Sequence, residues 1–257
     1  IRYLRLIYGR KIFMFSSIMG CTALAAFGLW QWAGVYMALC LLIGTYRELE
    51  EKQVSIFLAS CFSILSTAGF SLFTFIIYSK ISGAGVRTIL SQSTTPLVEQ
   101  LQQVPRFQGM SLDSFLWYIP SATVITLMVA LFVSLTVSRL PRNRADFIKL
   151  RMFKLPDWAV WAFILSLGAT FIPDEESLLS LISMNILAVS LAAYFFQGIA
   201  VFTYFLDRLS VFGFWRLLAY FLAFFQMFLF ISCLGILDYW FDFRLQTTSN
   251  FSKKTFT

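Results

Sequence analysis

The side chains that could carry chemistry in this chain are few, and no histidine is among them. Without an imidazole, a Ser-His triad and a histidine-ligated zinc site are excluded. The four cysteines stand singly in apolar stretches with no CxxC spacing, so neither a metal site nor a disulfide framework is indicated. The sequence therefore predicts a protein that is not an enzyme and that uses no metal and no cofactor.

The best-placed pair of carboxylates is Asp238 and Asp242, which follow the last apolar run and precede Arg244. A spacing of four residues puts the two on one face of a helix. A paired-carboxylate hydrolase would need a base or metal ligand beside them, so the pair is expected to position a helix end at the membrane boundary. The other charges expected at membrane edges are Glu48, Asp207 and Arg208.

Three amide side chains fall inside apolar runs: Asn185, Gln197 and Gln226. Each of the two glutamines either joins two helices by a hydrogen bond, worth about 1 kcal/mol or less, or lines a ligand cavity. The first role is the commoner one in membrane bundles, and the second is a hypothesis for all three residues. No Asp, Glu, Lys or Arg is expected near the middle of a membrane span, so a proton-relay carboxylate has no candidate.

Composition indicates which elements must position these side chains. Of 257 residues, 59% are hydrophobic and 13% are charged, whereas about 25% of the residues in a soluble domain are charged. So few charges cannot cover the surface of a globule of this size. The sequence predicts an all-α, polytopic transmembrane bundle whose main partner is lipid. Membrane sidedness explains the net charge of +7, so nucleic acid is not expected as a partner.

Hydropathy predicts about seven spans in a single domain over residues 1–244, followed by a polar tail over 245–257. The uncharged run from Ile12 to Tyr46 would make a helix of roughly 52 Å, too long for a hydrocarbon core of roughly 30 Å. We expect a break within Trp30–Gly34, where Gly34 suits a turn. The expected spans are about 12–30, 34–46, 54–79, 115–137, 158–172, 178–205 and 217–237.

The distribution of basic residues predicts the orientation of the chain. With the N-terminus on the cytoplasmic side, 14 of the 20 Lys and Arg residues fall on the inner side. This agrees with the excess of positive charge in cytoplasmic loops. We therefore expect a membrane protein with a cytoplasmic N-terminus and an extracytoplasmic C-terminus.

Two loops have structure of their own. The outer loop from Ser82 to Ser114 carries apolar residues at near-helical spacing, interrupted by prolines, which predicts short amphipathic helices on the outer membrane face. They act either as a lid over a cavity or as a plain connector. The inner loop from Ser138 to Pro156 mixes basic and apolar residues. Charge that sets topology is its favoured role, and contact with lipid or a partner protein is the alternative. Its candidate residues are Arg142, Arg144, Lys149, Arg151 and Lys154.

A series of short motifs, in order along the chain, carries a family resemblance: Leu155–Trp158, Gln197–Phe202, Phe205–Arg208 and Gly235–Arg244. Their order and spacing resemble the YybS-like family of predicted bacterial membrane proteins along nearly the whole chain. The resemblance implies a protein of the bacterial cytoplasmic (inner) membrane. The stretch around Gly9 resembles the segment after that family's first hydrophobic helix, which implies a further span before this chain begins. The family is similar in helical layout to the substrate-binding subunits of energy-coupling-factor vitamin transporters and to MreD-like cell-shape proteins.

These resemblances imply two hypotheses for function. In the first, the bundle is a small-molecule binding or transport subunit that works with partner proteins. The chain has no Walker motif, so ATP use would come from an ATPase-containing partner. In the second, it is a membrane scaffold or assembly protein of the cell envelope that recruits other membrane proteins. The outer amphipathic loop and the polar residues of the last two spans favour the first hypothesis.

Overall fold

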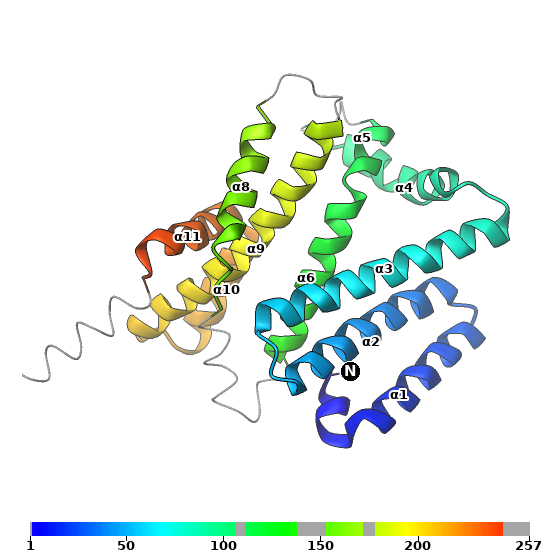
Figure 1. Ribbon diagram of the computed structural model, residues 1–257, viewed down its shortest axis with the longest axis horizontal. Helices are drawn as coiled ribbons and strands as arrows, with labels where there is room; N and C mark the ends of the chain where they lie inside the picture. The colour runs from blue at the N-terminus through cyan, green and yellow to red at the C-terminus, as the bar shows by residue number, and fades with distance from the viewer. Residues whose placement is uncertain (1, 106–110, 138–152, 172–177, 244–257) are drawn as a thin grey trace, which may run out of the picture. The chain divides into compact units, whose positions relative to one another are not determined.

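The computed structural model describes residues 2–105, 111–137, 153–171 and 178–243, and every regular element in these ranges is an α-helix (Figure 1). The all-α fold expected from composition is therefore confirmed. The chain divides into two compact units, Ile1–Pro141 and Arg142–Thr257. Each unit is described by itself, and the prediction of one domain over 1–244 stays a prediction.

Three helical stretches are long and apolar enough to cross a membrane. They are α3 (Ile56–Ser82), the Ile119–Thr136 stretch of α6 (Ile119–Val137) and α9 (Leu178–Arg208). A fourth crossing results if the bent pair of α10 and α11 counts as one span. An all-α membrane bundle fits this arrangement, whereas the number of seven spans is not confirmed.

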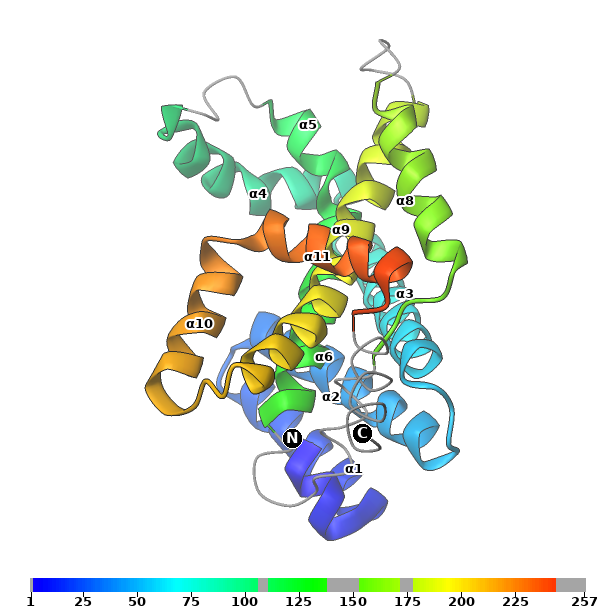
Figure 2. The ribbon, with the colours of Figure 1, turned by 90° about the vertical axis from the view of Figure 1, so that its left-hand side faces the viewer.

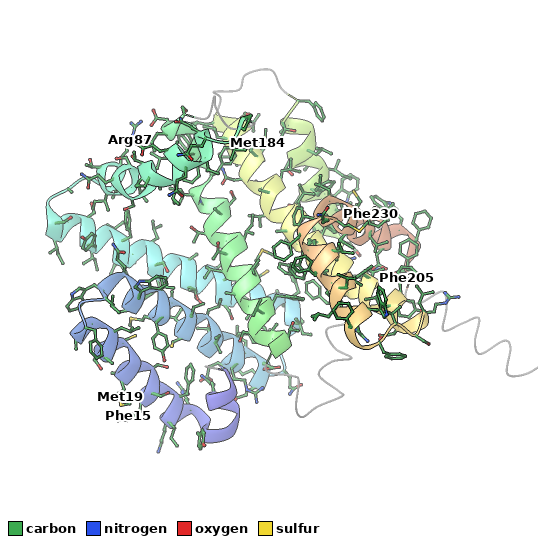
Figure 3. The ribbon with its side chains drawn as sticks, turned by 180° about the vertical axis from the view of Figure 1, so that it is seen from behind. Phe15, Met19, Arg87, Met184, Phe205 and Phe230 are labelled. Atoms are coloured by element: carbon green, nitrogen blue, oxygen red, sulfur yellow. The ribbon has the colours of Figure 1, made fainter. Side chains whose placement is uncertain are left out.

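Large apolar side chains are exposed on many of the described helices, including the first one. On α1 (Arg2–Ala26), the labelled side chains of Phe15 and Met19 in Figure 3 point away from the helix on its outer side, and they are 69% and 60% exposed. Burial against lipid explains such a surface, because hydrocarbon is the solvent that apolar side chains prefer.

The first two helices form a pair joined by a turn at Gly28. Gly28 has a φ of 75°, a left-handed conformation that glycine adopts without a steric penalty. The second helix, α2 (Trp30–Glu51), then begins at Trp30, so Gly34 lies inside a helix. The expected break within Trp30–Gly34 is therefore wrong by a few residues. The signal was Gly28, which stands just before the two tryptophans.

The described residues of the loop from Ser82 to Ser114 are mostly helical, as their spacing predicts. Helix α4 (Val86–Gln102) continues through Pro96, which was expected to interrupt it, and buries Thr94 and Val98. A short helix, α5 (Leu112–Trp117), then leads into α6. Pro120 falls in the first turn of α6, where no intrahelical bond needs its missing N–H.

The second unit is arranged around α9, the longest helix of the described residues at 31 residues. Helices α8 and α11 both pack on α9. The span expected over 217–237 is instead two helices, bent by 94° at a break after Phe225 (Figure 2). The helices other than α9 are α8 (Trp158–Ala169), α10 (Gly213–Phe225) and α11 (Phe228–Phe241).

Helix α11 crosses α9 at very close range because two glycines meet there. A Cβ atom added to Gly198 would overlap the carbonyl oxygen of Ile231 and lie 2.8 Å from its carbonyl carbon. A Cβ atom added to Gly235 would overlap the carbonyl oxygen of Tyr194 and lie 2.8 Å from the backbone nitrogen of Gly198. Only glycine permits backbones to approach so closely, as at small-residue interfaces in membranes.

The end of α9 and the start of α10 are held together by a polar network. Arg216 donates to Asp207 at 2.8 Å and to the hydroxyl of Tyr220 at 3.2 Å. That hydroxyl lies 2.9 Å from Oγ1 of Thr203, one turn further into α9. Helix α10 therefore starts beside the last turn of α9 and runs back along it.

Candidate functional site

The side chain of Gln197, at the crossing of α9 and α11, makes three hydrogen bonds. It is 1% exposed. Its Oε1 accepts a hydrogen bond from the backbone N–H of Leu155 at 3.0 Å, and its Nε2 donates to the carbonyl of Gly235 at 3.1 Å and to Oδ2 of Asp238 at 3.2 Å. One amide thus joins α9, α11 and the segment before α8.

Two carboxylates lie near this junction, Asp238 within α11 and Asp242 directly after it. Asp238 is completely buried beside Gln197. Asp242 ends α11 in a left-handed conformation, with a φ of 42°, and accepts a bond from Nζ of Lys154 at 2.6 Å. The carboxylate at the end of the helix is thus paired with a cation, while the one a turn earlier contacts an amide in the interior.

Tyr194, three residues before Gln197 on α9, is another buried polar side chain of the second unit. Its side chain is 1% exposed, and the hydroxyl makes no hydrogen bond with any residue that the structure describes. The ring packs edge-on against Phe163 of α8 at 5.9 Å, and Asp157 and Tyr239 lie within electrostatic range of the hydroxyl. We call Lys154, Leu155, Tyr194, Gln197, Asp238 and Asp242 the polar cluster.

The three amides expected to line a cavity are not brought together. Gln197 belongs to the polar cluster, but the side chain of Asn185 bonds to Leu181 of its own helix at 2.8 Å. Gln226 is exposed at the break between α10 and α11. It precedes Gly235 by nine residues, about 13 Å of helix. The bonds of Gln197 connect α9 to α11, which is the structural role considered for the glutamines, whereas the bond from Asn185 to Leu181 stays within α9.

The edge charges Asp207, Arg208 and Glu48 have different surroundings. Asp207 pairs with Arg216, whereas Arg208 is exposed in the last turn of α9. In the first unit, Glu48 accepts a bond of 2.6 Å from the buried Arg5. This hydrogen bond, together with the nearby charges of Arg5, Arg10 and Lys52, holds the pKa of Glu48 below its ordinary value despite partial desolvation.

Several predicted residues lie outside the described ranges. Of the basic set on the inner loop, Lys154 alone is described, and it belongs to the polar cluster. The residues outside are Arg142, Arg144, Lys149, Arg151 and Arg244.

Sequence reasoning missed three members of the site: Tyr194, Gly198 and the backbone of Leu155. A glycine inside a long apolar helix, such as Gly198, signals close approach of another backbone. Tyr194 lies one turn before Gly198 on α9, so its position on the same face as this glycine was the available signal. Nothing local marks the N–H of Leu155, because its bond joins residues 42 positions apart.

The groups of the polar cluster can donate and accept hydrogen bonds within an otherwise apolar set of helices. Among the described residues, no group of three or more His, Cys, Asp or Glu side chains could hold a metal ion. A buried amide, a buried carboxylate and a buried hydroxyl can orient a polar molecule or stabilise a crossing of helices. Fold and composition together define a helical membrane-embedded protein.

The comparisons with known proteins agree with that class. A family described as a predicted membrane protein (DUF2232) matches residues 1–239, and the chain belongs to this family. No curated protein and no solved structure matches the chain.

Proposed function

We propose that this membrane protein is a non-enzymatic subunit that binds or transports a small molecule together with partner proteins. In this proposal it lies in a bacterial cytoplasmic membrane, and an ATPase-containing partner supplies any ATP hydrolysis. A transport role is favoured by the sequence motifs, which resemble a family similar in helical layout to the substrate-binding subunits of energy-coupling-factor transporters.

The observation that carries the proposal is the hydroxyl of Tyr194. It is buried on α9, three residues before Gln197, and makes no hydrogen bond with any described residue. Burying a hydroxyl without a partner costs roughly 1–3 kcal/mol in proteins. A polar molecule bound at the cluster would recover that cost by bonding to the hydroxyl. The carboxylate of Asp238 and the cation of Lys154 would orient such a molecule.

The test is native mass spectrometry of gently extracted protein, comparing the unmodified chain with Tyr194→Phe. We expect a small molecule to co-purify with the unmodified chain and to be lost or greatly reduced in Tyr194→Phe. The matched control is Tyr204→Phe, which removes the same atom from the same helix ten residues away, about 15 Å along α9. The control should retain the molecule.

Stability separates a binding defect from a folding defect in this experiment. Since Tyr194→Phe removes a hydroxyl that has no described partner, the variant should melt at the same temperature as the unmodified chain or higher when both are freed of any bound molecule. If no small molecule is found, and a stoichiometric membrane protein co-purifies instead, the proposal is wrong and the scaffold function takes its place.

A further inference from the structure

We infer that α10 and α11 form a re-entrant pair, so that the chain from Gly213 to Phe243 enters and leaves the membrane on the same side. That side is the one where α9 ends, at Arg208. The segment that follows residue 243 would then lie on the same side of the membrane as the loop before α8. This differs from the expectation, drawn from seven straight spans, that the C-terminus lies on the opposite side.

The two ends of this segment both contact the last turns of α9. At its start, Arg216 pairs with Asp207 at 2.8 Å. At its end, the ring of Phe243 lies 6.0 Å from the ring of Phe205, which is labelled in Figure 3. Phe205 and Asp207 are two residues apart, so the entry and the exit of the segment are at the same end of α9.

The contact with the segment before α8 is independent of these two. Lys154 lies four residues before the first residue of α8, and its Nζ bonds to Asp242 at 2.6 Å. Helix α8 runs antiparallel to α9, because Leu155 contacts Gln197 whereas Phe163, further along α8, contacts Tyr194 nearer the start of α9. The start of α8, the end of α9 and the end of α11 therefore face the same side.

The lengths of the two helices also favour re-entry. Helix α10 has 13 residues and α11 has 14, about 20 Å and 21 Å of helix, and each is shorter than a hydrocarbon core of about 30 Å. A bend of 94° between them prevents the two lengths from adding along one direction. Ser232, near the turn, donates to the carbonyl of Leu191, which is about 25 Å along α9 from Arg208.

The close crossing of the glycines explains why α11 is held against α9 after the bend. Helix α11 lies across α9 in Figure 2. Because Gly198 and Gly235 have no side chains, the backbones of the two helices come into contact at this crossing. Non-helical backbone at membrane depth is tolerated where protein surrounds it or water reaches it. Because α11 packs on α9, protein lies beside the break between α10 and α11, and the non-helical backbone there can be tolerated within the membrane.

Charge supports the same conclusion from the sequence alone. Three basic residues follow α11: Arg244, Lys253 and Lys254. If α10 and α11 are re-entrant, these residues join the 14 on the inner side, so that 17 of the 20 Lys and Arg residues lie there. The re-entrant arrangement thus agrees with the positive-inside rule better than seven straight spans do.

Labelling of single cysteines in the full chain tests the inference. Each variant carries one new cysteine, at Ser252→Cys in the tail, Asn143→Cys in the loop before α8 or Ser177→Cys in the loop before α9, with the four native cysteines replaced by alanine. Intact cells receive a maleimide that does not cross membranes. We expect Ser252→Cys to behave as Asn143→Cys does, and Ser177→Cys to behave oppositely.

The inference is overturned if Ser252→Cys instead reacts as Ser177→Cys does. Because the comparison is relative, it does not depend on which side is cytoplasmic. If the chain without native cysteines fails to fold, a fluorescent reporter or a phosphatase is fused after Thr257 of the unmodified chain and, in a second fusion, after Asn143. The same reporter is expected to be active at both sites, and different active reporters at the two sites overturn the inference.

Discussion

The close approach of α9 and α11 makes Gly235→Ala a strongly destabilising substitution. The added methyl group would overlap the carbonyl oxygen of Tyr194 and lie 2.8 Å from the nitrogen of Gly198, where ordinary contact begins at 3.4 Å. Even this second atom is 0.6 Å too close, and backbone atoms cannot rotate away as a side chain can. The two helices must separate, and overpacking of this kind typically costs about 1–3 kcal/mol.

The measurement is the melting temperature of the purified protein in detergent, followed by loss of the monodisperse peak on size-exclusion chromatography. For a chain of this size, 1 kcal/mol corresponds to about 2–4 °C, so we expect Gly235→Ala to melt about 2–12 °C lower. The control is Gly168→Ala on α8, where an added Cβ atom has no atom within 4 Å. It should leave the melting temperature unchanged or raise it, because alanine favours a helix over glycine by roughly 1 kcal/mol.

Equal melting temperatures for the two alanine variants would refute the reasoning, since the crossing would then have room that the structure denies it. The double variant Gly198→Ala with Gly235→Ala gives a second check. Once one methyl group has separated the helices, the other meets less resistance. The two losses should therefore sum to more than the loss measured for the double variant.

Two further predictions concern the polar contacts. Gln197→Leu should lower the free energy of unfolding by about 1–3 kcal/mol, because it removes bonds to buried groups, whereas Gln226→Leu at the exposed break should be nearly neutral; equal losses in denaturant titrations would contradict this. The second concerns pH: the hydrogen bond from Arg5 lowers the pKa of Glu48 in the folded protein, so the stability from this pair is complete above the ordinary pKa and is lost as pH falls through the lowered one. The melting temperatures of the unmodified chain and Glu48→Gln should therefore differ at neutral pH and converge in acid, and a constant difference would count against the pair.

Much of the helical layout could be predicted from hydropathy because long apolar runs have few alternatives in lipid. The span expected over 178–205 corresponds to α9, and the one over 54–79 corresponds to α3 within three residues at each end. Their boundaries follow local signals, such as the charges of Asp207 and Arg208 and the left-handed Gly83.

The break between α10 and α11 could not be predicted in the same way. No proline lies in 217–237, and its one glycine, Gly235, is inside α11 rather than at the break. The bend arises where α11 packs on α9, and this is a tertiary cause that no local pattern records. The reading of 217–237 as one straight helix gave no sign that Asp238 is buried inside the protein beside Gln197, as the structure shows.

The glycine crossing and the polar cluster depend on each other, and this makes their roles separable by experiment. Gln197 reaches both Gly235 and Asp238 only because the glycines let α11 approach α9 closely. Opening the crossing with Gly235→Ala should therefore weaken stability and any binding together. Tyr194→Phe leaves the crossing intact and removes one hydroxyl, so it should weaken binding alone. If instead Tyr194→Phe lowered the stability of the ligand-free protein as Gly235→Ala does, the cluster would be a structural joint of the bundle and not a binding site.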